Sequence, residues 1–334
     1  MRRWKRLLAV LLVGTLAACG SGSGDDEDTL IVYGAPHGEL LSTMVDTFTQ
    51  QTGIKVKIRP GADSELANQI VQEGKASPAD VFMTENSPAM GLVDAKGLFA
   101  RVDDQTVAQV PPGFVPSNHN WIGYAARSTV LVYNTKALPE DQQPASIMDL
   151  AQPAWQGRFG IAPSGADFQA IVSAVLALKG TDATRQWLDG LKRNAKIYTN
   201  NIAILKGVDT GEVPAGISYH YYWYKDRAAG GTGSANAQLK FFGKADPGAF
   251  LSVSGSGVLA SSDKKAQAQQ FLAFLTSKTG QQVLADSKAM EYPVADGVAN
   301  PKLKPMSELD PPAVDPAKLN GPEVVQLMQQ AGLL

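Results

Sequence analysis

The stretch TLIVYGAPHGELLSTMVDTFTQQTGIKV, residues 29–56, contains the signals of a strand, a helix and a second strand in close succession. Residues 29–35 form an apolar run, which predicts a buried strand. Apolar side chains then recur at helical spacing between Leu40 and Phe48, and Gly53 is suited to cap the end of that helix. Residues 54–58 alternate between apolar and polar, which predicts a half-buried strand.

The same alternation of strand and helix continues along the chain. It predicts strands at 79–85, 129–135 and 215–219, and helices at 66–74, around 171–178, around 271–275 and near 283–284. Residues 293–322 are rich in proline and should run over the surface, followed by a last helix at 323–330. Repeated alternation of this kind indicates an α/β fold with mostly parallel sheets.

The first residues have the pattern of an export signal. Four basic residues precede the apolar run 7–16, which is too short to span a bilayer. Small residues then lead to Cys19, the single cysteine of the chain, so a disulfide within one chain is excluded. The sequence LAACG resembles a bacterial lipobox, which implies a diacylglycerol on Cys19. We therefore predict a signal peptide at 1–18 and a lipidated, flexible tether at 19–28 that anchors the protein to the extracytoplasmic face of the cell membrane.

Composition excludes some classes of function. Without the four basic residues of the leader, 26 Lys and Arg remain against 32 Asp and Glu, so the exported part carries a negative net charge. This balance argues against nucleic acid as a partner. The sequence also lacks the G-x-S-x-G, H-E-x-x-H and P-loop motifs, and we predict that the protein is not an enzyme.

Polar side chains follow three of the predicted strands. His37 comes after the first strand, Glu85 ends the strand at 79–85, and the sequence YHYYWY, residues 219–224, follows the strand at 215–219. Open parallel sheets bind ligands beyond the carboxyl ends of their strands. An imidazole, a carboxylate and several phenols are therefore expected at one edge of the structure.

These stretches resemble the ferric-iron-binding proteins of bacterial ABC importers. The similarity extends over nearly all of the exported chain and is carried by these segments: residues 29–56, GKASPADVFMTENS, WIGYAARSTVLVYNT, NNIAILKGVDTGEVPAGISYHYYWYKD, FLAFLTSKTGQQVL and EYPV. The resemblance implies a two-lobed periplasmic-binding-protein-like fold of type II, with crossover strands and a ligand cleft between the lobes. The lobes would comprise residues 29–127 with 252–302, and 128–251 with 303–334.

The resemblance also implies a site. Tyr221 and Tyr222 would be phenolate ligands of Fe³⁺, completed by His37 and Glu85. An anion such as phosphate or carbonate would share the metal, held by these residues: Arg127, Ser164, Gly165, Asn201 and Tyr219. The partners would be an ABC permease and its ATPase, with the binding protein acting as a monomer.

The ligand chemistry can be argued from the residues themselves. A small, hard, triply charged ion favours anionic oxygen, and a nearby cation can deprotonate a phenol whose pKa is near 10 in water. Two phenolates and one carboxylate balance three positive charges, and a neutral histidine adds a nitrogen donor.

Adjacent tyrosines in a strand would point to opposite faces of the sheet. Tyr221 and Tyr222 are therefore expected just beyond the strand, in a turn or at a helix start. Trp223 and Tyr224 are interpreted as packing residues. Tyr219 and His220 stand where the family commonly has asparagine, so the anion could differ or accept the hydroxyl of Tyr219, and either residue could displace an expected ligand.

The main alternative is a lipoprotein of the same fold that binds a polyamine or another small organic cation. Tyr219, Tyr221, Trp223 and Glu85 would then form an aromatic cage.

Overall fold

The structure is a computed structural model that describes residues 28–34 and 36–334. The predicted signal peptide and Cys19, with nearly all of the tether, lie outside the described residues. The strands are β1 (Leu30–Gly34), β2 (Val56–Pro60), β3 (Val81–Met83), β4 (Ile122–Asn134), β5 (Phe159–Ile161), β6 (Ala195–Ile197), β7 (Ala215–Tyr219), β8 (Ala237–Lys240), β9 (Leu251–Val258) and β10 (Tyr292–Pro293). The helices are α1 (Gly38–Thr52), α2 (Asp63–Glu73), α3 (Ser87–Asp94), α4 (Asp104–Val107), α5 (Ala166–Lys179), α6 (Thr181–Asn194), α7 (Asn201–Asp209), α8 (His220–Ala228), α9 (Lys265–Thr276), α10 (Lys278–Asp286) and α11 (Gly321–Gln330).

The strands follow the order β2-β1-β3-β9-β4-β7-β5-β6, and β8 and β10 both pair with β4. The prediction of mostly parallel sheets is correct only at the two ends of this order, where β1 pairs in parallel with β2 and β3, and β5 pairs in parallel with β6 and β7. The centre is antiparallel, since β9 runs opposite to β3 and β4, and β4 runs opposite to β7. The expectation fails there because β9 pairs with β3 and β4, strands far from it in the sequence, and the local alternation of strand and helix does not set the direction of such pairing.

The strand β4 is shared between the two ends of the sheet. Its first part, from Ile122 to Ser128, pairs with β9, and its second part, from Thr129 to Tyr133, pairs with β7. All thirteen of its residues are buried. Arg127 lies near the middle of β4, next to the point at which the strand changes its partner from β9 to β7. Its side chain therefore lies between the two ends of the sheet.

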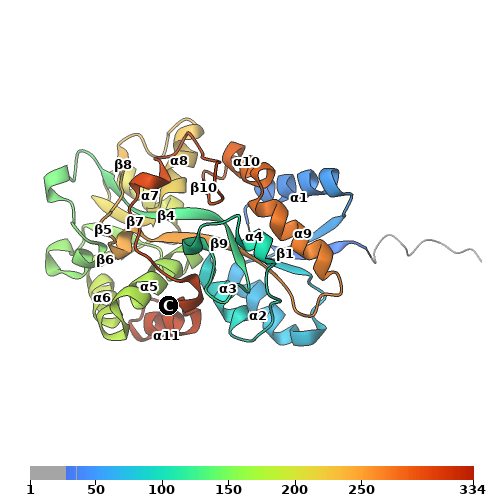
Figure 1. Ribbon diagram of the computed structural model, residues 1–334. Coiled ribbons are helices and arrows are strands. Elements are labelled where there is room, and N and C mark those ends of the chain that lie inside the picture. Colours follow the sequence, from blue (N-terminus) through green and yellow to red (C-terminus); the bar gives the residue numbers. More distant parts are fainter. Residues whose placement is uncertain (1–27, 35) are drawn as a thin grey trace, which may run out of the picture.

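Helices cover both faces of β1. Leu30 and Val32 of β1 pack in one apolar cluster with residues of α1 and α9, whereas Tyr33 packs in another with residues of α2. Figure 1 accordingly shows β1 between α1 and α9 on one side and α2 and α3 on the other. Burial on both faces explains the continuous apolar run of this strand.

The predicted helix ends agree with the structure. Gly53 caps α1 in the left-handed conformation at φ 75°, and its N–H donates to the carbonyl of Thr49. Gly74 follows α2 at φ 55°. Only glycine adopts such angles at little cost, so each glycine ends its helix and turns the chain into the next segment.

The proline-rich stretch from 294 to 320 runs from β10 to α11 and includes the 3₁₀ turns Met306–Glu308 and Pro316–Lys318. Buried Leu303, Leu309 and Leu319 fix it to the body of the protein. Within the described residues, no helix combines the length and the apolar character needed to cross a membrane.

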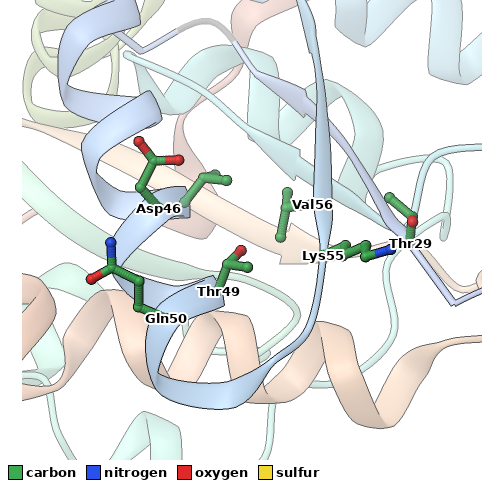
Figure 2. A pocket seen from close by; sticks show the side chains of 7 residues that line it. Thr29, Asp46, Thr49, Gln50, Lys55 and Val56 are labelled. Carbon is green, nitrogen blue, oxygen red and sulfur yellow. The ribbon is translucent and has the colours of Figure 1, made fainter. Parts of the chain in front are cut away.

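A surface hollow of about 560 Å³ lies between α1 and β2. Figure 2 shows its lining, which includes Asp46, Thr49 and Lys55. It opens at the amino end of β1, whereas the polar residues of the predicted site follow the carboxyl ends of strands.

Candidate metal centre

Each predicted ligand lies just beyond the end of a strand. His37 follows β1 and immediately precedes α1, and Glu85 lies two residues beyond Met83, the last residue of β3. Tyr221 and Tyr222 lie in the first turn of α8, which begins directly after β7. This is the helix-start position that the geometry of adjacent tyrosines requires, and it allows both rings to point the same way. Their ring centroids are 4.1 Å apart.

The two phenols converge on a carboxylate that the sequence analysis missed. Tyr221 Oη and Tyr222 Oη donate to Asp167 Oδ2 at 3.0 and 2.9 Å. Asn201 Nδ2 donates to the same oxygen at 2.9 Å, and Asn86 Nδ2 donates to Asp167 Oδ1 at 3.3 Å. Asp167 is the second residue of α5 and is buried. One carboxylate therefore accepts hydrogen bonds from four side chains.

This environment holds the phenols in their protonated form. Burial raises the pKa of Tyr221 well above 10, and the negative charge of Asp167 raises it further. The same two causes, in the same order, raise the pKa of Tyr222. A metal ion that binds these oxygens must therefore displace two protons.

His37 contacts carboxylates on both ring nitrogens. Nδ1 lies 3.3 Å from Glu85 Oε1, and Nε2 lies 3.3 Å from Glu291 Oε1. Lys225 Nζ, from α8, lies 3.0 Å from Nε2. The imidazole meets the ring of Tyr221 edge-on at 5.7 Å. His37 therefore lies close to both Glu85 and Tyr221, so predicted ligands from different parts of the chain face each other.

Hydrogen bonds from its backbone to Asp63 fix the position of Glu85. Asp63 Oδ1 and Oδ2 accept hydrogen bonds from the backbone N–H groups of Glu85 and Asn86, at 2.9 and 2.8 Å. Burial raises the pKa of Glu85, while the charges of Arg127 and His37 act in the opposite direction.

Arg127 forms a buried pair with Glu291. Its Nε lies 3.3 Å from Glu291 Oε1, and its Nη2 donates to Ser254 Oγ at 2.8 Å. Both side chains are about 98% buried or more. Burial by itself would raise the pKa of Glu291, but the charge of Arg127 and the contact with His37 outweigh it, so the pKa is lowered to about 2.

Replacing Glu291 by glutamine is therefore expected to destabilise the metal-free protein by ~3 kcal/mol, because Arg127 would remain buried without its counter-charge. A carboxyl whose pKa is lowered on folding stabilises the protein above its ordinary pKa of 4.5, and this contribution is lost as the pH falls through about 2. The difference between wild type and variant should therefore be full at neutral pH and shrink in acid. Guanidinium unfolding followed by circular dichroism measures it, with Glu308→Gln as the control.

Glu308 is an exposed residue that pairs with Lys304 on the surface. Its replacement should cost less than ~1 kcal/mol, since exposed ion pairs contribute little. Equal stability of Glu291→Gln and wild type at neutral pH would contradict the assignment of Glu291 as the partner of Arg127.

The residues predicted for an anion lie around this centre, but they are engaged in different ways. Asn201 donates to Asp167, and Arg127 pairs with Glu291. Ser164 and Gly165 precede α5, and Ser164 lines a hollow of about 460 Å³ together with Asn86. Tyr219 ends β7, is fully buried and stacks at 6.2 Å on Tyr221.

The ring of His220 meets that of Tyr221 edge-on at 6.1 Å, but its hydrogen bond goes to β4. It is fully buried, its Nδ1 accepts the backbone N–H of Ser128 at 3.1 Å, and its ring stacks on Tyr292 at 4.7 Å. Burial lowers the pKa of His220 to about 3. These contacts make it a neutral residue of the core.

The geometry also bears on the predicted aromatic cage. Trp223 packs in a separate apolar cluster with residues of α7, and its Nε1 donates to the carbonyl of Ala237 at 2.8 Å. Lys225 Nζ already lies over the ring of Tyr221, 4.8 Å from its centroid. Trp223 and Tyr221 therefore do not enclose one space.

Within residues 28–34 and 36–334, no group of three or more His, Cys, Asp or Glu side chains is arranged to hold a metal ion.

Three residues of the centre escaped the sequence analysis: Asp167, Glu291 and Lys225. Asp167 follows the short strand β5 and a Ser-Gly turn, so it obeys the same rule of strand ends that selected His37 and Glu85. Recognition of the short run FGI, residues 159–161, as a strand would have identified it. No comparable local signal marks Glu291 or Lys225.

Comparison with known proteins places this chain among transport proteins. Residues 43–311 match the model of a family described as bacterial extracellular solute-binding protein. The chain is 52% identical over 328 residues to the Fe(3+)-binding periplasmic protein of Serratia marcescens, covering 98% of this chain and 97% of the relative. It is 36% identical to the major ferric iron-binding protein of Neisseria meningitidis serogroup A, covering 97% of each.

The fold is similar to the crystal structure of iron-bound HitA from Pseudomonas aeruginosa, with a TM-score of 0.84 and 43% sequence identity over 91% of this chain and 99% of that one. The two-lobed type II fold expected from the sequence is confirmed by this likeness. The chain belongs to the bacterial extracellular solute-binding proteins, and within them to the ferric-iron-binding family.

Proposed function

We propose that this protein captures ferric iron outside the cytoplasm and delivers it to the permease of an ABC importer. The observation that carries the proposal is the convergence of Tyr221 Oη and Tyr222 Oη, with His37 and Glu85 facing them. The Serratia and Neisseria relatives, which are named for ferric iron, support it.

The proposed protein ligands are Tyr221, Tyr222, Glu85 and His37. Two phenolates and a carboxylate neutralise the three charges of Fe³⁺, so the ion can be held in a buried site at little electrostatic cost. Neutral imidazole supplies a nitrogen donor. Burial removes competing water and strengthens each of these contacts.

We propose further that the chain forms two lobes that close on the ion. Lobe 1 comprises residues 29–127 and 252–302, and lobe 2 comprises residues 128–251 and 303–334. The change of partner by β4 at Ser128 and Thr129 is consistent with a crossover there. His37 and Glu85 belong to lobe 1 and the tyrosines to lobe 2, so an ion bound to both favours the closed form. The permease would recognise that form.

The proposed location is the extracytoplasmic face of the membrane, with a lipid on Cys19 as the anchor. The protein would act as a monomer, with the permease and its ATPase as partners. Radiolabelled fatty acid in the wild type, absent from Cys19→Ser, would test the anchor.

Visible absorption during titration with ferric chloride tests the proposed function. A tyrosinate-to-iron charge-transfer band that saturates at one ion per protein is expected. Isothermal calorimetry with spermidine is the matched measurement for an organic-cation binder, and no heat of binding is expected. Spermidine binding without a coloured ferric complex would refute the proposal and favour a polyamine carrier.

A further inference from the structure

Given the proposed ferric function, we propose that Lys225 is an internal competitor of the ferric ion. Its amine contacts His37, a predicted ligand, in the metal-free protein. An entering ion would displace the amine from this position, and the amine would return when the ion leaves. Lys225 would thus limit the affinity for iron and speed its release.

Helical spacing places Lys225 beside a predicted ligand. Lys225 follows Tyr221 by four residues in α8, and residues four apart lie on the same face of a helix. Lys225 Nζ accordingly lies 4.8 Å from the centroid of the Tyr221 ring. The side chain therefore passes the phenol and ends close to His37.

The amine uses the lone pair that a metal ion would need. Lys225 Nζ lies 3.0 Å from His37 Nε2. A protonated amine has only donors, so it can bond to Nε2 only through the lone pair of that nitrogen. The ring proton then lies on Nδ1, which is 3.3 Å from Glu85 Oε1. Nε2 is therefore the nitrogen that can bind a metal without a change of tautomer, and the ion and Lys225 compete for it.

The charge of the centre gives a second argument. In the metal-free protein, Lys225 and Arg127 lie near the carboxylates of Glu85, Asp167 and Glu291 and offset part of their negative charge. Binding of Fe³⁺ with release of two phenol protons adds one unit of positive charge to this region. An ammonium that helped to balance the metal-free centre would then be repelled by the added charge.

The amine has space into which it can move. Lys225 and His37 line a hollow of about 1000 Å³, which also includes Glu39 and Asp286. Lysine has a flexible four-carbon stem, so rotation about its bonds can carry the ammonium away from His37 while α8 keeps its position. The displaced charge would then lie beside carboxylates and solvent instead of beside the ion.

The test is the variant Lys225→Met, which removes the charge and keeps the apolar stem. Competition against a soluble ferric chelator near neutral pH should show an affinity roughly tenfold to a hundredfold above that of the wild type, the usual size of a coupling between two binding events. Transfer of iron to excess chelator, followed by loss of the coloured band, should be slower. Lys225→Arg keeps a cation that has only donors, and it should bind iron as the wild type does.

The stability of the metal-free protein provides an independent measurement. Lys225→Met should unfold at a lower guanidinium concentration than the wild type, because the carboxylates lose a counter-charge. Stability and iron affinity are thus expected to change in opposite directions, whereas loss of a merely structural lysine would lower both. Lys288→Met is the matched control, since Lys288 lines the same hollow but is exposed and pairs with Glu39. It should leave both properties unchanged.

An affinity of Lys225→Met equal to or below that of the wild type, with the coloured complex retained, would overturn the inference and leave the ferric function intact. The absence of a coloured complex from the wild type would instead overturn the ferric function, and the inference with it. Circular dichroism checks the folding of each variant, and Lys225→Gln takes the place of Lys225→Met if the methionine variant does not fold.

Discussion

Phenylalanine at both Tyr221 and Tyr222 is expected to lower the affinity for ferric ion by roughly ten-thousandfold or more. Loss of an outer-shell partner typically costs ten- to a hundredfold in metal affinity, and loss of a directly bonded anion should cost at least the upper part of that range for each oxygen. The double variant also leaves the ion with two uncompensated positive charges in a buried site. Competition against a soluble ferric chelator measures the change, and the charge-transfer band should vanish.

The single variants should show which oxygen matters more. Each is expected to keep a weakened complex with a shifted or fainter band. Tyr224→Phe is the matched control on the same helix. The hydroxyl of Tyr224 accepts a hydrogen bond from the backbone N–H of Lys304, which is not one of the residues of the predicted site. An undiminished band in the double variant would show that the colour and the binding arise elsewhere in the molecule.

The sequence predicted which strand ends place the candidate ligands, but not which charged residues surround them. Strand ends are local features, and the apolar runs before His37 and Glu85 identified two of them directly. The position of Tyr221 and Tyr222 followed from the geometry of adjacent side chains, and α8 begins where that argument requires.

The remaining residues could not be derived locally. Glu291 reaches Arg127 across 164 positions of sequence, and only the pairing of β10 with β4, which joins Tyr292 to Ala126, brings them together. Lys225 has the sequence pattern of a solvated helix residue, and only the folded structure brings its amine to His37, which lies 188 positions earlier in the chain. The antiparallel pairing at the centre of the sheet could not be predicted for the same reason, since pairing between distant strands leaves no periodic signal in either strand.

The affinity for ferric ion is expected to fall about a hundredfold for each unit by which the pH is lowered near neutrality. In the metal-free protein, burial and the charge of Asp167 raise the pKa values of Tyr221 and Tyr222, so both phenols are protonated throughout this range. Both are ionised in the complex, so each ion bound releases two protons, and acid opposes binding by mass action. Burial also raises the pKa of Glu85, so a third proton should be released as the pH approaches that raised value.

Proton release is measured by adding base to hold the pH constant while the protein takes iron from a soluble chelate. A protein-free blank supplies the contribution of the chelate and of ferric hydrolysis, and the double phenylalanine variant supplies the contribution of all other groups. Two protons per ion, lost in the double variant, are expected. A release close to zero would mean that the phenols are already ionised in the free protein, in which case Asp167 could not be their hydrogen-bond acceptor. The measured stoichiometry therefore tests the arrangement of Tyr221, Tyr222 and Asp167 independently of affinity, and it identifies mild acidification as a physical route by which the ion can be released.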